Sequence, residues 1–129
     1  KGETLITVQD YTSGKLFDDA VSYAFYPVDL HTKTGVRPKP LKRGIVPSIP
    51  LGALVPKGSR NLIVAGRCVS SDRLANSGLR VQASCMGMGQ AAAAAATLAA
   101  QGNTTPSEVP LAQIHGLLKK HGAIIPSKA

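Results

Sequence analysis

Residues 85–101 read Cys-Met-Gly-Met-Gly-Gln, then six alanines, then Thr-Leu-Ala-Ala-Gln, and they are the most informative part of the sequence. Alanine is the best helix former, so the stretch predicts a helix despite its two glycines, with Gly102 as the C-terminal stop. No charged residue stands between Arg80 and Glu108. A helix that is apolar on every side has to be buried on every side. We therefore expect this helix in the interior, where its small side chains let backbone or a ligand approach closely.

The rest of the sequence is small for the task of covering such a helix. The whole sequence has 129 residues, 43% of them hydrophobic, which suffices for one globular domain with a modest core. With three Tyr, two Phe and no Trp, large core-filling side chains are scarce. We therefore expect something else to cover the helix: a partner chain, further sequence or a large flat cofactor. An apolar face left open would favour homodimers.

The segments next to the long helix predict short elements joined by loops. Residues 61–66, Asn-Leu-Ile-Val-Ala-Gly, form a short apolar run that is typical of a strand buried on both faces. Residues 67–84 are polar and read as irregular. A second, amphipathic helix is expected from Pro110 to the stop at Gly122, with leucine and isoleucine side chains on one face.

The first half of the chain predicts little regular structure. Residues 17–24 read as one or two helical turns, and the second half of residues 23–30 reads as a strand. The basic, proline-containing residues 32–43 predict an exposed loop or hairpin tip, and residues 45–55 predict short extended pieces at an edge. The expected fold class is therefore α/β or α+β: a short strand set, a buried alanine-rich helix and a C-terminal amphipathic helix.

The positive charge is concentrated in the middle of the chain. Between Lys33 and Arg80 stand ten basic residues and one acidic residue, Asp72, so this stretch carries +9. Such a field attracts phosphates, carboxylates or nucleic acid, although a solvated basic face accounts for it equally well. No aromatic residue is interleaved to stack on bases, so we do not expect nucleic-acid binding. The alternative function is a standalone basic module that binds polyanions with salt-dependent affinity.

Several classes of protein are not indicated by the sequence. No apolar stretch approaches the ~18 residues of a membrane span, so no membrane partner is expected. Cys68 and Cys85 are not in a Cys-x-x-Cys pair and the histidines are scattered, so we expect buried free thiols and no metal site. The residues after Lys1 are polar and do not predict a secretory signal, which leaves the compartment open between cytoplasm and bacterial periplasm.

A strand at 61–66, a polar loop and the start of the small-residue helix make a plausible ligand site. The free N–H groups and the positive dipole end expected at residues 84–87 favour anionic or electron-rich oxygen. Gly87 and Gly89 would leave room for a flat ligand. An ordinary, tightly packed strand–helix unit is an equally good interpretation of the same pattern.

Several short stretches stand in a fixed order along the chain: residues 17–21, 26–31, 49–51, 54–58, 61–70, 80–82, 85–86 and 89–92. The most specific are Ala-Gly-Arg-Cys at 65–68 and Gly-Gln-Ala-Ala at 89–92. Together they resemble the C-terminal part of FAD-dependent oxidoreductases, a group distantly similar to the fumarate-reductase and glucose-inhibited-division flavoproteins. The resemblance covers nearly the whole chain.

The resemblance implies a piece of a larger enzyme. Flavoproteins of this kind open with a Gly-x-Gly-x-x-Gly turn that holds the FAD pyrophosphate, and this sequence has no such fingerprint. We expect residues 1–47 to be a remnant of the substrate or cap region and residues 48–129 to be the C-terminal segment of the FAD-binding domain. The partner is then the rest of the flavoprotein, together with a small-molecule substrate. A separate subunit of a split flavoenzyme is the other possibility, which a start codon just upstream of Lys1 would favour.

The resemblance also assigns residues to the flavin site. It implies that the chain after residues 64–66 passes the ribityl group and that the start of the alanine-rich helix faces the flavin pyrimidine, where its dipole raises the flavin's potential. The positions carried over are Gly66, Arg67, Ser70, Val81, Gln82 and Gly89. Related flavoproteins often have an acidic residue where this sequence has Arg67, so Asp72 is added as a ribityl ligand.

The candidate catalytic residues are His31, Arg80 and Asp29, with Arg37 as a further possibility. Hydride moves through the flavin itself, so the protein needs only an orienting or proton-transferring group nearby. Histidine is a residue type suited to proton transfer near neutral pH, and Arg80 would clamp an anionic substrate. A structural histidine, hydrogen-bonded to Asp29, is the simpler interpretation of the same residues.

Overall fold

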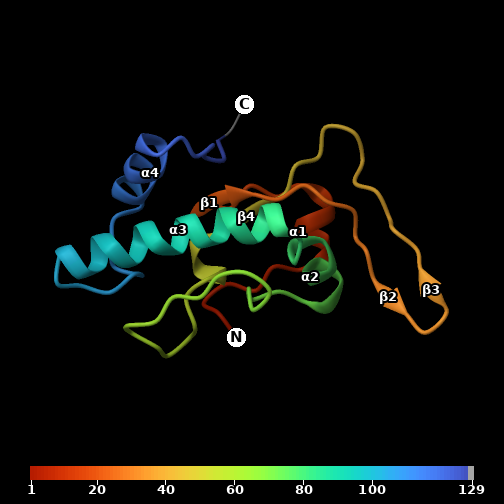
Figure 1. Cartoon of the computed structure of the whole chain (residues 1–129), viewed down its shortest axis with the longest axis horizontal. Helices are drawn as coiled ribbons and strands as arrows, with labels where there is room; N and C mark the ends of the chain where they lie inside the picture. Colours follow the sequence, from red (N-terminus) through yellow and green to blue (C-terminus); the bar gives the residue numbers. More distant parts are fainter. Residues whose placement is uncertain (128–129) are drawn as a thin grey trace.

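The computed structural model describes residues 1–127 and shows an α+β fold built along one long helix (Figure 1). The elements, in chain order, are α1 (Val8–Ser13), β1 (Ala20–Tyr23), β2 (His31–Thr32), β3 (Gly35–Val36), β4 (Ser48–Pro50), the 3₁₀ turn η1 (Leu51–Ala53), α2 (Arg73–Leu79), α3 (Gln82–Gln101) and α4 (Leu111–Lys120). The named strands pair only antiparallel, so α+β is the fitting member of the two expected classes.

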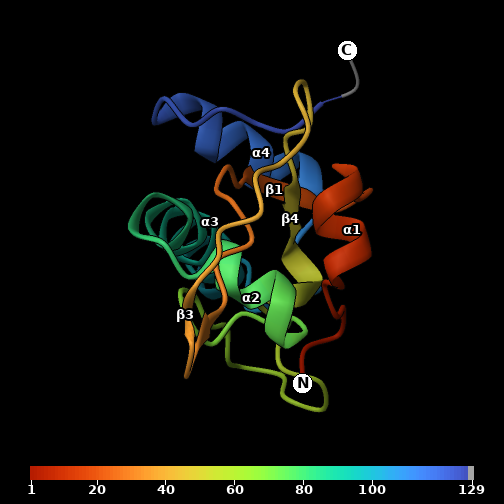
Figure 2. The ribbon, with the colours of Figure 1, turned by 90° about the vertical axis from the view of Figure 1, so that its right-hand side faces the viewer.

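Two small strand pairs stand apart from each other. β1 pairs antiparallel with β4, with Ala20 opposite Pro50 and Tyr23 opposite Ser48, and this pair lies between α3 and α1 in Figure 2. β2 and β3 form an exposed hairpin that projects from the body beyond the start of α3 (Figure 1). The expectation of an exposed hairpin tip in residues 32–43, and of short extended pieces in 45–55, is confirmed.

One core holds the helices and the β1–β4 pair together. α3 packs against β1 and α4, and α1 packs against α2. The largest fully buried apolar side chains come from all of these parts of the chain: Ile6, Tyr11, Ile49, Leu54, Leu79, Met88, Ile114 and Leu118. Because β1 and β4 pair across residue 47, the residues on both sides of the expected domain boundary share this core. The assignment of residues 1–47 and 48–129 to two regions of a larger flavoprotein stays a prediction, and it does not correspond to two separately packed units here.

The long helix is as predicted in type and end, but its environment differs. α3 begins at Gln82, earlier than the expected start at Cys85, and Gly102 caps its end. Its residues Ser84, Met88, Ala91, Ala95 and Ala99 are buried. A stripe at alternating three- and four-residue spacing is exposed instead: Ala83, Met86, Gln90, Ala93, Thr97 and Ala100. Within residues 1–127, α3 is therefore not buried on every side, and that expectation is wrong. The expectation that so small a chain does not enclose the helix by itself is confirmed.

Gly87 lies on the buried side of α3, where the helix meets β1. A Cβ at this position would overlap the hydroxyl of Ser22. Gly87 therefore serves close packing of helix on strand, whereas a Cβ at Gly89 would meet nothing within 4 Å. Of the two glycines expected to make room for a ligand, only Gly89 faces open space.

The apolar run 61–66 is not a strand. Among residues 1–127, its one backbone hydrogen bond outside local turns runs from Val64 N–H to the carbonyl of Leu54, at 2.8 Å. Leu62 is 51% exposed and Gly66 has a left-handed φ of +86°. A strand buried on both faces needs paired neighbours, and the described chain places none beside this segment.

Three further expectations about local structure need correction. Residues 17–24 form a turn followed by β1 rather than helical turns, because the apolar side chains of Ala20 and Val21 are buried against the core in an extended segment. The strand expected after Tyr23 is reduced to an isolated bridge between Val28 and Lys39. The stretch 67–84, read as irregular, contains α2 and the start of α3. The amphipathic α4, by contrast, lies between Pro110 and Gly122 as expected.

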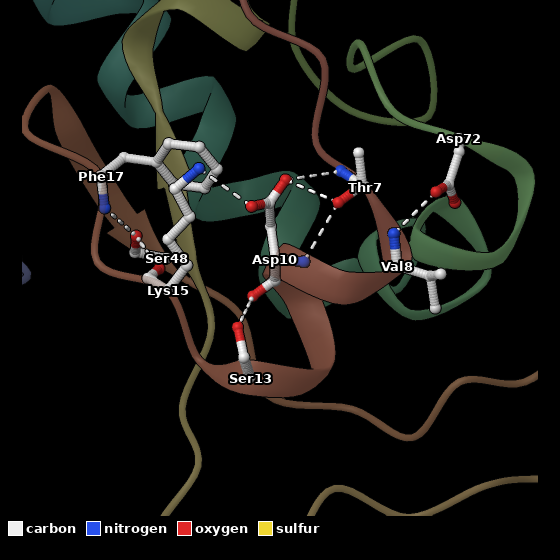
Figure 3. A network of polar contacts seen from close by, with 8 residues as sticks. All are labelled: Thr7, Val8, Asp10, Ser13, Lys15, Phe17, Ser48 and Asp72. Atoms are coloured by element: carbon white, nitrogen blue, oxygen red, sulfur yellow. Dashed lines mark hydrogen bonds and ion pairs between the residues drawn. The ribbon is translucent and has the colours of Figure 1, made fainter.

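Polar contacts fasten α1 to its neighbours (Figure 3). Thr7 and Asp10 form a reciprocal capping box, and Lys15 Nζ lies 2.9 Å from an Asp10 carboxylate oxygen. Burial raises the pKa of Asp10, but the hydrogen bonds from Lys15 and Thr7 outweigh it and hold the pKa below its ordinary value. The carboxylate of Asp72, from a distant part of the sequence, accepts a hydrogen bond from the Val8 N–H. In residues 1–127, no helix has the length and apolar character needed to cross a membrane.

Candidate functional site

The three candidate catalytic residues come together at one shallow pocket of about 230 Å³. Asp29 lies on the segment that enters β2, His31 is the first residue of β2, and Arg80 caps the end of α2. His31 Nε2 lies 3.6 Å from Asp29 Oδ2, and Arg80 Nη2 donates to the Asp29 carbonyl at 3.4 Å. Arg37, the further candidate, lies next to the exposed hairpin and does not line this pocket.

One face of α2 forms the other wall of the pocket. Its lining residues are Arg73, Asn76, Ser77 and Arg80, at the spacing that places side chains on a single helix face. Arg73 and Asn76 were not singled out by the sequence. The sequence feature that identifies them is their helical spacing relative to Ser77 and Arg80. This spacing has meaning only if Asp72 is the N-cap of a helix and not part of an irregular loop.

The backbone of Asp29 is hydrogen-bonded to α2, and the residue lines the pocket. Its N–H donates to Ser77 Oγ at 3.0 Å, and the Ser77 hydroxyl in turn donates to the Leu74 carbonyl. The Asp29 side chain is 14% exposed, and its Oδ1 is buried without a hydrogen-bond partner among the described residues. Buried polar atoms are nearly always satisfied, so an exception marks a candidate functional position.

The start of α3 and the loop before α2 form a second part of the site. Val81 is the N-cap of α3 and Gln82 its first residue, and within residues 1–127 no side chain caps this end. Gly66 lies against the first turn: a Cβ built on it would be 3.9 Å from Cys85 Sγ. Its φ of +86° is a conformation that other residues rarely adopt. The structure thus brings Gly66 next to the first turn of α3, which Val81 and Gln82 begin.

The other residues expected near the flavin lie elsewhere or have partners within the chain. Ser70 is buried and its Oγ accepts from the Gly2 N–H at 2.9 Å. Asp72 accepts from Ala75 N–H with one carboxylate oxygen and from Val8 N–H with the other. The Arg67 side chain is exposed, and Gly89 lies about two turns along α3 from Gln82. The seven residues therefore do not form one cluster.

A cleft of about 400 Å³ lies on the side of this loop that faces the N-terminal residues. Ser70 is the one expected flavin contact that lines it, together with Val64, Cys68 and Val69. Cys68 and Cys85 are both free, as expected, but Cys68 is exposed rather than buried and Cys85 is half-buried. Among residues 1–127, no three His, Cys, Asp or Glu side chains are placed to hold a metal ion.

Comparison with protein families decides the identity of the chain. A model of the family described as FAD dependent oxidoreductase matches residues 1–118. The chain belongs to the FAD-dependent oxidoreductase family. No curated protein and no solved structure matches it significantly.

Membership of the FAD-dependent oxidoreductases makes FAD the cofactor to test against these residues. The uncapped start of α3 and the left-handed Gly66 beside it suit the polar edge of a flavin, because they offer backbone N–H groups and leave space for close approach. Ser70 and Asp72 suit it less, because their side-chain oxygens already accept hydrogen bonds within the chain. The first turn of α3 is therefore the part of the chain that fits the cofactor best.

Proposed function

We propose that this chain is a C-terminal segment of an FAD-dependent oxidoreductase that contributes the pyrimidine and ribityl side of the flavin site. In this proposal residues 1–47 belong to a substrate or cap region, residues 48–129 belong to the flavin domain, and the rest of the flavoprotein is the partner. The observation that carries it, within the family, is the uncapped start of α3 beside Gly66. Bound FAD supplies the hydride-transfer chemistry.

The first turn of α3 offers backbone N–H groups that have no partner within the helix. Gln82 and Ala83 are exposed, so the helix begins at the surface of the chain. The helix dipole adds a partial positive charge at the same point, which favours negative charge on a bound ligand. No acidic residue lies in the first turn to compensate that charge.

The segment 61–66 is evidence for the proposal that this chain belongs to a larger flavin domain. Its sequence is typical of a strand buried on both faces, yet in this chain it is unpaired and Leu62 is exposed. In the proposed enzyme, strands from the remaining flavin domain would pair with it. The pyrophosphate of FAD would also be bound there, since the Gly-x-Gly-x-x-Gly fingerprint is absent from this sequence.

A negative charge at the start of α3 should lower the reduction potential of the bound flavin. In the flavin-loaded enzyme that carries this segment, Ala83→Asp places a carboxylate at the exposed first turn and opposes the helix dipole. We expect the potential to fall by roughly 10–20 mV, the equivalent of one charge–dipole interaction. The measurement is a spectroscopic redox titration.

Ala100→Asp is the matched control, because Ala100 is exposed on the same stripe at the other end of α3. It adds the same charge far from the first turn and should leave the potential unchanged. Equal shifts in both variants, or no shift in either, would contradict the placement of the flavin at the start of α3.

The chain by itself should bind no stoichiometric flavin. It offers contacts to one edge of the ring system but no pyrophosphate turn, so most of the binding energy for a dinucleotide is missing. The check is the absorbance spectrum of the purified 129-residue chain after incubation with excess FAD and gel filtration. A yellow, equimolar complex would overturn the proposed division of the site.

A further inference from the structure

We propose that the pocket between α2 and the segment entering β2 binds the carboxylate group of a small, singly charged acid. The pocket is lined by two guanidinium groups, Arg73 and Arg80, and by the imidazole of His31. Asp29 is the one acidic residue in its lining. The juxtaposition of two arginines on one helix face, across from Asp29 and His31, carries the inference.

The two arginines are available to a ligand. Neither forms an ion pair with any carboxylate in residues 1–127, and the Arg80 guanidinium uses one Nη2 contact, to the Asp29 carbonyl, at 3.4 Å. Arg73 is exposed and Arg80 is half-buried, so both reach the pocket from its wall. A planar guanidinium presents a fork of donors that matches a carboxylate, whereas an ammonium group does not.

The size of the pocket limits what it holds. About 230 Å³ lies below the range of roughly 300–1,000 Å³ that is usual for whole drug-sized ligands. The pocket therefore suits one charged group with a few attached atoms. Asn76 and Ser77 complete the wall with polar groups, so a purely apolar ligand is not favoured.

The charge balance selects a monoanion. Arg73, Arg80 and Asp29 together carry one net positive charge, and a single carboxylate compensates it. Inorganic phosphate is a mixture of monoanion and dianion near neutrality, and the second charge of the dianion would face the Asp29 carboxylate without compensation. We therefore expect a carboxylate to bind more tightly than phosphate.

In the flavoprotein, this carboxylate would belong to the substrate, a step that rests on the proposed function. Arg80 directly precedes Val81, the N-cap of α3, so the pocket adjoins the helix start assigned to the flavin. The two sites would then hold the acid group of a substrate and the flavin at the same end of α3. The substrate class is a small organic acid.

The test is an NMR titration of the 129-residue chain with acetate at constant ionic strength. We expect saturable shifts of residues 29–31 and α2, with a dissociation constant on the order of millimolar for so small a ligand. Acetamide, the neutral isostere, should cause no such shifts, and phosphate should bind more weakly than acetate. Arg73→Gln and Arg80→Gln should each weaken acetate binding about tenfold or more.

Arg43→Gln is the matched control, since Arg43 is an exposed arginine outside this pocket. It should leave acetate binding unchanged. Arg73→Gln keeps the test valid if Arg80→Gln disturbs the fold, because Arg73 donates no hydrogen bond among the described residues. Acetate binding that is no tighter than acetamide binding, that is insensitive to Arg73→Gln, or that is exceeded by phosphate would each overturn the proposal. The titration requires no flavin, so its failure and that of the flavin placement at α3 are separate results.

Discussion

Replacing Tyr11 with alanine is expected to lower the free energy of unfolding by about 3–5 kcal/mol, the cost of deleting a large buried ring. Tyr11 is 1% exposed and lies in the core between α1 and α2. Its hydroxyl donates a 2.8 Å hydrogen bond to the Tyr26 carbonyl, so the substitution also removes the partner of a backbone acceptor. Urea denaturation of the 129-residue chain measures the effect.

The contact between Tyr11 and Gly78 provides a control, because the effect of Gly78→Ala on the free energy of unfolding should change sign when the Tyr11 ring is removed. A Cβ at Gly78 would lie 2.6 Å from the Tyr11 Oη and 2.7 Å from Cζ, so Gly78→Ala should destabilise the native chain. In the Tyr11→Ala background the ring is gone, and the same substitution should be neutral or stabilise by up to about 1 kcal/mol through helix propensity. Additive effects of the two substitutions would contradict this packing.

Tyr11→Phe separates the contribution of the hydroxyl to stability from that of the ring. Burial raises the pKa of Tyr11 to about 12, against an ordinary value of 10.0. The folded state therefore holds the phenolic proton more tightly than the unfolded state. Its stabilising contribution is complete below pH 10 and is lost as the pH rises towards 12. Tyr11→Phe should keep most of the ring's contribution and remove this alkaline loss.

The sequence predicted the elements whose signal is local. Alanine propensity fixes α3, Gly102 ends it, and the spacing of Ile114 and Leu118 fixes the buried face of α4. The segment 61–66 misled because an apolar run becomes a strand only when neighbouring strands pair with it. Such pairing depends on distant residues, and a local pattern contains no information about them.

The candidate site was predictable in part for the same reason. Asp29, His31 and Arg80 could be chosen for their chemistry, but their meeting at one pocket depends on how α2 packs against the segment entering β2. The sequence does not indicate Arg73, because the polar pattern of residues 67–84 predicts a loop where the structure has α2. The flavin contacts of Gly66, Val81 and Gln82 are predictions from resemblance to a family, which carries the tertiary information that one sequence lacks.

Asp72 was expected to bind the flavin, but its contacts assign it a structural role whose loss should be large. One carboxylate oxygen accepts from the Ala75 N–H at 2.8 Å and caps α2, and the other accepts from the Val8 N–H at 2.6 Å at the start of α1. Asp72→Ala removes a helix cap and a hydrogen bond to a charged group, so we expect a loss of about 2–4 kcal/mol in unfolding free energy.

Asp72→Asn distinguishes the two contacts of this carboxylate. The amide oxygen can still cap α2, but the amide nitrogen replaces the oxygen that faces Val8, so two donors oppose each other. Its stability should fall between those of the native chain and Asp72→Ala, whereas Asp18→Asn, at an exposed aspartate, should stay within about 0.5 kcal/mol. All of these differences should appear in thermal denaturation of the flavin-free chain. If Asp72 served only to bind flavin, its replacement would not change the stability of the flavin-free chain. An unaltered Tm for Asp72→Ala would therefore contradict the structural role and favour the flavin-binding role.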